Sequence, residues 1–253
     1  MILKRLNMDT TWLLQLGKFR LLVDPWLKGV EVDYAPWFNK QWHRTAPTRV
    51  TEVEEFDAVL VTQKYADHCH IPTLRDLSPP HILAPKSLRR KLERWMPQAS
   101  VRYFDANRDA LVLGTMEIQR LPNHHRFGPT YDSYLISSDA ESILIANHGL
   151  TINNEILDIF DNKRPNVLLS PFNLYRLPRL VGGLVSPGLP ALKELVEALR
   201  PRFVIATHDE DKHARGLIPT LSKVNVFDHQ MVDKFPWLEG RYLNISDYNP
   251  VSL

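Results

Sequence analysis

The sequence has very little cysteine and no long uncharged apolar run. Cys69 is the only cysteine among 253 residues, which excludes an internal disulfide and fits a reducing compartment. No stretch approaches the 18 uncharged apolar residues of a typical membrane span, and the opening MILKRLNMDTT has no signal-peptide core. We therefore expect a cytoplasmic protein without a transmembrane segment.

A strong charge of one sign is also missing. The formal net charge is +2, which is too small to favour a nucleic-acid partner. The densest basic patch, KSLRRKLER at residues 86–94, is typical of the solvent-exposed face of a helix. Apolar residues make up 44% and charged residues 24%, as in an ordinary globular protein. The length allows a substantial core, and we expect a single domain over residues 1–253.

Strand-like patterns dominate the first part of the chain, and strands and helices mix after it. Strands are expected at 2–6, 11–16, 19–23, 58–62, 81–84, 100–104, 110–113, 116–121, 133–137, 142–146, 166–170 and 203–207. Helices are expected at 71–77, 86–96, 151–160 (with Thr151 as the N-cap) and 191–199. Segments 28–55 and 171–190 are expected to be loops, and the chain from residue 209 to be less regular. This order favours an α/β fold in which two mixed sheets pack face to face with helices outside, a four-layer αββα sandwich.

Side chains that bind metals follow several of the predicted strands. The stretch VTQKYADHCH at residues 61–70 places Tyr65, Asp67, His68 and His70 within six positions. Other histidines come at the ends of later strands: His124, His125, His148 and His208. Because sites are commonly built from loops at one edge of a sheet, this pattern predicts a metal site.

Five segments carry a family resemblance. They are LLVDPWL at 21–27, TQKYADH at 62–68, LPNHH at 121–125, ILIANHG at 143–149 and RFVIATH at 202–208. In this order they resemble the metallo-β-lactamase fold superfamily, with its D-P-W, T-H-x-H-x-D-H, P-x-x-H and G-D-T-G elements and a last strand ending in histidine. The D-P-W element is similar to the branch that includes the ascorbate-phosphate lactonases and the N-acyl-phosphatidylethanolamine phospholipases.

The resemblance implies one metal ion where the family can hold two. Gln63 and Tyr65 stand at the two leading histidine positions of the motif. A glutamine is a poor zinc ligand, and a tyrosine binds only as the phenolate, which is costly at neutral pH. The positions of the second metal are all filled, and His148 takes the place of the bridging aspartate. The implied ligands are Asp67, His68 and His208, completed by His148 or His125.

Such ligands suit one divalent transition metal ion, most of all zinc, with iron or manganese as alternatives. A bound water becomes a hydroxide near neutral pH, and the resemblance implies its attack on an ester, lactone or phosphodiester. The catalytic candidates are Asp67, His148 and Tyr65. The Tyr65 hydroxyl would stabilise a developing oxyanion, or the ring only fills the space of a lost metal.

The expected substrate is a small molecule that is anionic or contains an acyl group. Aromatic residues at 34–42 would form an apolar wall, or pack against the sheet edge. The segment 173–185, with Arg176, Arg179 and several leucines, would act as a lid, touch a membrane weakly or form a subunit interface.

Two other functions compete with this hydrolase. A catalytically inactive binding or scaffold protein is favoured by Gln63 and Tyr65, while the complete second ligand set opposes it. A metal-free hydrolase that uses Asp67 and His68 as an acid–base pair lacks an evident nucleophile.

Three neighbouring residues have their own expected roles. His70 is expected to begin the following helix rather than to bind a metal. Cys69 is expected to be a buried thiol. Asp24 is expected either to cap its strand or to orient a ligand histidine.

Overall fold

The structure is a computed structural model that describes residues 1–105, 110–123, 131–139, 141–160 and 164–253. The candidate ligand His125 and its neighbour His124 lie outside the described residues. Among the residues that are described, no helix is long and apolar enough to cross a membrane.

The first large sheet has seven strands in the order β19-β1-β2-β3-β6-β7-β8. Their bounds are β1 Ile2–Arg5, β2 Trp12–Leu16, β3 Phe19–Val23, β6 Ala58–Leu60, β7 Ile82–Pro85, β8 Val101–Phe104 and β19 Val251–Ser252. Strands β3, β6, β7 and β8 run parallel to one another. The pairs β19–β1, β1–β2 and β2–β3 are antiparallel. Six of these strands confirm the sequence prediction to within two residues at each end. The short β19 was not predicted.

The second large sheet has six strands in the order β16-β13-β12-β11-β10-β9. Their bounds are β9 Ala110–Leu113, β10 Met116–Leu121, β11 Ser133–Ser138, β12 Glu141–Ile145, β13 Val167–Ser170 and β16 Phe203–Ala206. Strands β12, β13 and β16 run parallel, and β9 to β12 form an antiparallel meander. All six confirm the predicted strands.

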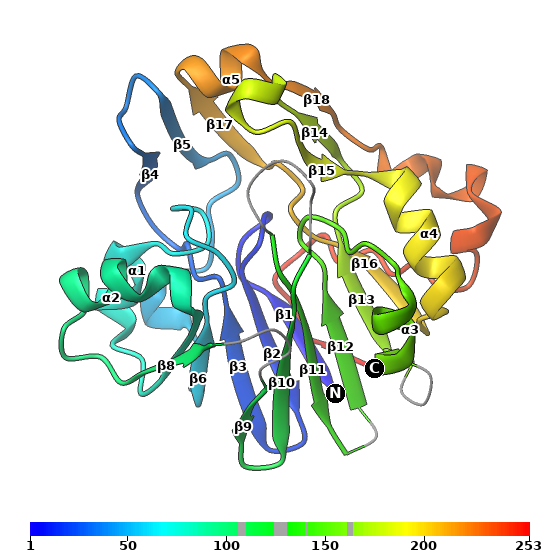
Figure 1. The fold of residues 1–253 in the computed structure, drawn as a ribbon, viewed down its shortest axis with the longest axis horizontal. Coiled ribbons are helices and arrows are strands. Elements are labelled where there is room, and N and C mark those ends of the chain that lie inside the picture. The colour runs from blue at the N-terminus through cyan, green and yellow to red at the C-terminus, as the bar shows by residue number, and fades with distance from the viewer. Residues whose placement is uncertain (106–109, 124–130, 140, 161–163) are drawn as a thin grey trace.

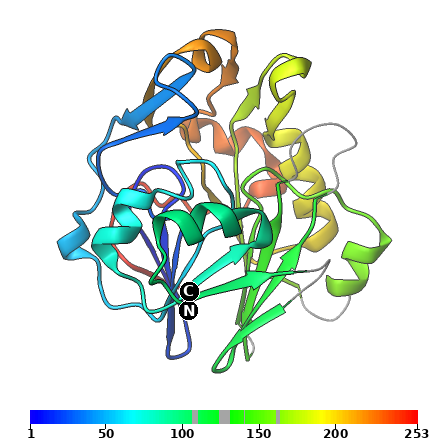
Figure 2. The same cartoon turned by 60° about the vertical axis from the view of Figure 1, so that its left-hand side comes forward.

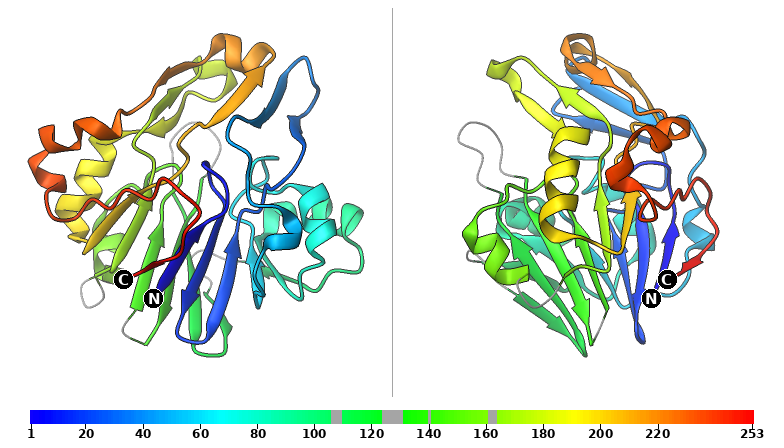
Figure 3. Two further views of the ribbon diagram at one scale, coloured as in Figure 1. Left: turned by 180° about the vertical axis from the view of Figure 1, so that it is seen from behind. Right: turned by 90° about the vertical axis from the view of Figure 1, so that its right-hand side faces the viewer.

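Three apolar clusters show that the sheets and helices form four layers. The inner faces of the two sheets meet in one cluster, which includes Leu14 and Leu60 from the first sheet and Ile136 and Leu169 from the second. The outer face of the first sheet packs against α1 (Ile71–Leu77) and α2 (Arg89–Trp95). The outer face of the second sheet packs against α3 (Asn154–Phe160) and α4 (Leu189–Leu199). The αββα architecture is therefore confirmed (Figures 1, 2 and 3).

Two small sheets stand beyond one end of the large ones, where loops or less regular chain were expected (Figure 1). One has the order β17-β5-β4, with β4 Val30–Asp33, β5 Asn39–His43 and β17 Lys212–Arg215. The other has the order β15-β14-β18, with β14 Leu174–Arg176, β15 Leu184–Pro187 and β18 Lys223–Asn225. The prediction that 28–55 and 171–190 are loops was therefore wrong, because each segment contributes two strands. The chain after 209 forms only short elements.

The remaining elements are short. Helix α5 spans Leu217–Leu221, and 3₁₀ turns cover Val50–Glu52, Lys86–Leu88, Arg179–Val181, His229–Lys234 and Pro236–Leu238. The predicted helix start at Thr151 was wrong, because α3 begins at Asn154. The Asn153 side chain accepts a hydrogen bond from the Ile156 amide, which is the geometry of an N-cap. Thr151 instead donates its hydroxyl to Asn123.

Candidate metal centre

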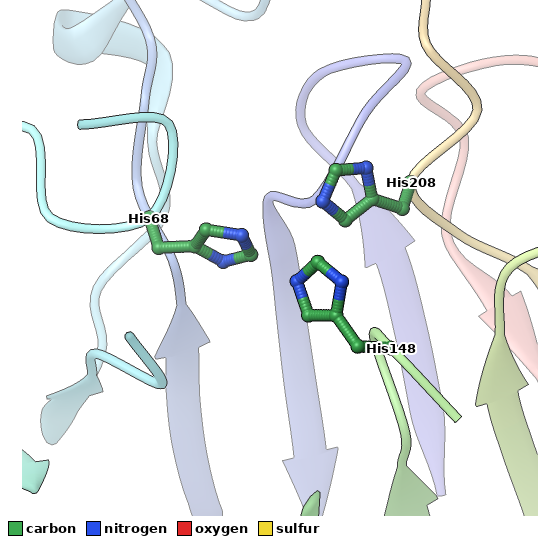
Figure 4. Close-up of side chains that lie close together, drawn as sticks. All are labelled: His68, His148 and His208. Atoms are coloured by element: carbon green, nitrogen blue, oxygen red, sulfur yellow. The ribbon is translucent and has the colours of Figure 1, made fainter. Parts of the chain in front are cut away.

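Three histidines meet where parallel strands of the two large sheets end. His68 follows β6 of the first sheet, while His148 follows β12 and His208 follows β16 of the second. All three are buried, and one ring nitrogen from each lies within 4.8 Å of those of the other two. Figure 4 shows the three rings converging on a common centre. The site therefore depends on both sheets.

Each ring has its Nδ1 atom beside an acceptor, which leaves Nε2 for the centre. The Nδ1 of His68 lies 2.7 Å from the Asp24 Oδ2, and that of His148 lies 2.8 Å from the Val185 carbonyl oxygen. The Nδ1 of His208 lies 3.2 Å from the Glu210 Oε1, at ion-pair distance but without hydrogen-bond alignment. Metal-binding histidines are typically oriented in this way through their second nitrogen.

The inward-facing nitrogens fit a metal ion. Within the described part of the chain, the Nε2 atoms of His148 and His208 are buried without a hydrogen-bond partner. Leaving buried polar atoms unsatisfied is costly, and a divalent ion bound to neutral imidazole would remove that cost. The three residues could hold one ion.

Asp67 lies beside two of the three rings. Its Oδ2 is 3.7 Å from the Nε2 of His68 and 3.9 Å from that of His208. Burial alone would raise the pKa of Asp67, but the charges on His68 and Lys212 hold it well below its usual range. Burial likewise opposes the charged form of His68, while the Asp67 and Asp24 carboxylates raise its pKa to about 9. Asp67 thus offers an anionic oxygen at the edge of the centre.

Lys212 brings a buried positive charge to the site, which the sequence analysis missed. Its side chain is 6% exposed, and its Nζ lies 3.1 Å from Asp9 Oδ2, 3.5 Å from Asp67 Oδ2 and 3.6 Å from Glu210 Oε2. Burial lowers the pKa of Lys212, but these carboxylates together raise it well above its usual value, so the ammonium stays charged. No local pattern marks this lysine, which begins β17 and pairs with His43 of β5.

Asp24 joins the ends of three strands at the centre. Besides the His68 ring, its carboxylate accepts hydrogen bonds from the Thr62 amide at 2.7 Å, the Thr62 hydroxyl at 2.6 Å and the Asn147 amide group at 3.2 Å. The fully buried carboxylate is thus placed to orient a histidine, one of its two expected roles. Asp24 and His208 have positive φ angles of 46° and 59°, and such strained backbone clusters at functional sites.

Gln63 and Tyr65 have different surroundings. The buried Gln63 amide group has no hydrogen-bond partner among the described residues. Tyr65 is half-buried in a cavity wall, and its ring lies beside that of Tyr131 with centroids 6.1 Å apart. The Tyr131 ring in turn stacks on His148 with centroids 3.9 Å apart. Burial raises the pKa of Tyr65 above its usual value, so the phenol remains a donor rather than a phenolate ligand.

His70 and Cys69 face away from the centre. The Nδ1 of His70 accepts a hydrogen bond from the Thr73 amide at the start of α1, so the prediction that it begins the helix is confirmed. Cys69 is buried, as expected, and burial raises the pKa of its thiol to about 11. A thiol with so high a pKa is a weak nucleophile at neutral pH.

The centre opens into a cavity of about 450 Å³ between the two small sheets. Asp67, His68, His148, His208, Glu210 and Lys212 lie among its lining residues. Its other walls are largely apolar and come from both small sheets and the loops beside them: Tyr34, Phe38, Leu177, Leu180, Val181, Val185 and Ile218. Arg176 and Arg179 are exposed and do not line this cavity, so they are not placed to hold a substrate there.

The αββα layers and the three buried histidines at strand ends are the architecture of a metallohydrolase-like fold. A family description, the Beta-lactamase superfamily domain, matches residues 8–208. The chain therefore belongs to the β-lactamase superfamily and has the metallo-β-lactamase fold. No curated protein matches the sequence.

Solved structures with the same fold cover nearly the whole chain. An isothiocyanate hydrolase from Delia radicum gut bacteria has a TM-score of 0.74 at 17% identity, covering 100% of this chain and 99% of its own. A possible metal-dependent hydrolase from Veillonella parvula has a TM-score of 0.71 at 14% identity, covering 100% and 99%. A metallo hydrolase from the archaeon Ignicoccus hospitalis has a TM-score of 0.65 at 14% identity, covering 99% and 97%. At these identities the likeness concerns the fold.

Proposed function

We propose that the protein is a metal-dependent hydrolase with a mononuclear centre. The observation that carries this proposal is the convergence of His68, His148 and His208, whose ring nitrogens lie within 4.8 Å of one another. These residues would hold the ion together with Asp67, and His125 would be a further ligand. Zinc suits this donor set best, and iron or manganese would also fit it. A bound divalent ion would supply a water of lowered pKa as the nucleophile.

Residues of the chain would position the substrate around the ion. Asp67 is held anionic by its neighbours and would orient the attacking water. The Tyr65 hydroxyl, at the cavity wall, would donate a hydrogen bond to the oxyanion that develops on the substrate carbonyl. His148 is fixed between Val185 and the Tyr131 ring, which would keep its Nε2 directed at the ion.

The cavity lining favours an uncharged ester or lactone with an apolar group over a phosphodiester. Lys212 is the one lysine or arginine among the described lining residues, and it already contacts three carboxylates. No free cation of the described lining would therefore neutralise a phosphate, whereas the apolar walls would bury an acyl or aryl group. Within this proposal, the resemblance of the Asp-Pro-Trp element to the branch that includes lactonases supports a lactone substrate.

Metal content measured by elemental mass spectrometry on tag-free protein tests the centre. We expect about one equivalent in the native protein and less than a tenth of that in His68→Ala/His208→Ala. His81→Ala, at an exposed histidine just before β7, is the matched control and should leave the content unchanged. About two equivalents would contradict the mononuclear centre. No metal after incubation with zinc, iron or manganese would favour a binding or scaffold protein.

Substrate class is tested next on the metal-loaded protein. Aryl esters and aliphatic lactones should be hydrolysed at least tenfold faster than bis(p-nitrophenyl) phosphate. A preference for the phosphodiester would show that the apolar lining of the cavity does not select an uncharged substrate. Tyr65→Phe should lower kcat for the preferred substrate by about a hundredfold, the lower end of the loss caused by removing one oxyanion-hole donor, with metal content unchanged.

A further inference from the structure

Exposed apolar side chains gather around the mouth of the cavity. Eleven of the fifteen large apolar side chains that are exposed in the described part of the chain lie in segments 29–45, 174–187 and 212–226. They are Val30, Val32, Tyr34, Trp37, Leu180, Val181, Leu184, Leu217, Leu221, Val224 and Val226. We refer to the exposed residues of these three segments as the rim. Concentrations of exposed apolar surface usually mark an interaction site.

In strand β4 the apolar side chains lie on the face of the small sheet that points to solvent. Glu31 points inward and is 1% exposed, while Val30 and Val32 on either side are 42% and 38% exposed. An antiparallel sheet with one face in water normally carries polar residues on that face. Here the polar residue faces the protein and the valines face out. Leu180, on the other small projection, is 99% exposed.

The rim also carries charge of a single sign. Its exposed ionisable side chains include five cations: Arg44, Arg176, Arg179, Arg215 and Lys223. No aspartate or glutamate in the three segments is exposed, because Glu31 is buried and Asp33 is partly buried. The rim is thus both apolar and cationic, although the whole chain has a formal net charge of only +2.

The two halves of the rim stand on the same end of the molecule. Figure 2 shows the β4–β5 hairpin with α5 on one side and the β14–β15 projection on the other, both beyond the ends of the large sheets. The cavity lies between them, since Tyr34 from one side and Leu180 and Val181 from the other line it. A flat partner that touched both projections would therefore cover the mouth of the cavity.

We propose that the rim docks on an anionic lipid surface. Apolar and aromatic side chains such as Leu180 and Trp37 would enter the interfacial region, where aromatic rings are favoured. The five cations would face lipid phosphates, each contributing to attraction that salt weakens. A second copy of the chain fits less well, because a twofold contact would bring cationic rims together. Docking would present the cavity to substrates dissolved in the lipid, but it does not depend on the hydrolase activity.

Vesicle co-sedimentation of the full chain tests the proposal. The probes are vesicles of phosphatidylcholine alone and of phosphatidylcholine mixed with phosphatidylglycerol, at low and high sodium chloride. We expect binding to the mixed vesicles at low salt, at least tenfold weaker binding to phosphatidylcholine alone, and release at high salt. No binding to the mixed vesicles at low salt would overturn the proposal.

Matched substitutions separate rim docking from general adsorption. Leu180→Asp places a carboxylate on the rim at a fully exposed position, so the fold should not change. Val112→Asp does the same on β9, at the opposite end of the molecule, where Val112 is 54% exposed. We expect Leu180→Asp to weaken vesicle binding by about tenfold or more, and Val112→Asp to have no effect. Equal losses in both variants would refute the proposal. A native dimer that Leu180→Asp dissociates, with no vesicle binding by either, would show that a second copy covers the rim.

Discussion

At the scale of single residues, the Asp24 carboxylate connects the fold to the candidate metal centre. It holds the His68 ring while also accepting hydrogen bonds from two other loops. We predict that Asp24→Asn lowers zinc affinity by about tenfold to a hundredfold, because a neutral amide replaces the anionic acceptor that orients the ring and raises its basicity. Isothermal titration calorimetry of the metal-free protein measures this. Asp57→Asn, an exposed carboxylate that accepts from the Arg20 amide, is the control, and equal affinities in the two variants would exclude the role of Asp24.

Lys212 illustrates how much a buried charge depends on its partners. Lys212→Met keeps most of the side-chain volume but leaves Asp9, Asp67 and Glu210 without their common cation. We predict that the free energy of unfolding falls by about 3–5 kcal/mol, as for other broken buried ion pairs. Urea unfolding monitored by circular dichroism measures it. Lys193→Met removes an exposed lysine of α4 and should change stability by less than about 0.5 kcal/mol. A loss of similar size in both variants would mean that Lys212 is not a structural charge.

Some residues of the candidate site could be predicted from the sequence because their side chains are of types that bind metals. Asp67, His68, His148 and His208 were expected because metal-binding side chains at the ends of β-rich runs leave a local pattern. The structure brings the three histidines together and places Asp67 beside them. Asp9, Glu31, Glu210 and Lys212 have no such pattern. They are ordinary charged residues until the fold buries them near one another.

At the scale of elements, the two large sheets were predictable and the two small sheets were not. The strands of the large sheets are short apolar runs bounded by turn residues, and such runs predict buried strands from the sequence alone. Strand β5 reads Asn-Lys-Gln-Trp-His and pairs with β17, which lies about 170 residues further along the chain. A short polar strand whose partner is so distant gives no periodicity to detect, so its existence follows only from tertiary pairing. The cavity walls come largely from these elements, and substrate class was therefore the least predictable property.

The β4–β5 hairpin should respond to acid through His43. The His43 ring packs on Trp26 with centroids 3.9 Å apart, and burial lowers its pKa below the usual 6.5. Because the pKa of His43 is lower in the folded state than in the unfolded state, neutral His43 contributes its full share to the free energy of unfolding above pH 6.5. That share is lost as the pH falls below 6.5, since the unfolded chain takes up the proton first.

We predict that His43→Phe, which keeps a ring but cannot gain a proton, loses stability less steeply than the native protein between pH 6.5 and pH 5. The difference in slope should be at most about 1.4 kcal/mol per pH unit, the limit for one proton. Urea unfolding across this pH range measures both slopes. Parallel pH dependences would show that His43 does not titrate with folding. His213→Phe, an exposed ring on the neighbouring strand, should leave the slope as it is in the native protein.

At the scale of the whole molecule, the candidate metal centre is a contact between the two halves of the fold. His68 belongs to the first large sheet, whereas His148 and His208 belong to the second. The inner faces of the two sheets also meet in an apolar cluster, which has no directional preference of its own. An unfolded chain would hold these three rings far apart, so an ion that needs all of them binds the native state alone. Metal binding must then stabilise the folded protein by mass action.

We therefore predict that zinc at about a thousand times its dissociation constant raises the free energy of unfolding of the metal-free protein by about 4 kcal/mol. For a chain of this length that corresponds to a rise in Tm on the order of 10 °C. Differential scanning calorimetry with and without zinc measures it, after a chelator has removed bound metal. His148→Ala keeps two histidines and Asp67 but breaks the link to β12, so its Tm should rise by less than half as much. An equal rise in this variant would place the bound zinc elsewhere on the molecule, and no rise in the native protein would mean that the three rings do not form a metal centre.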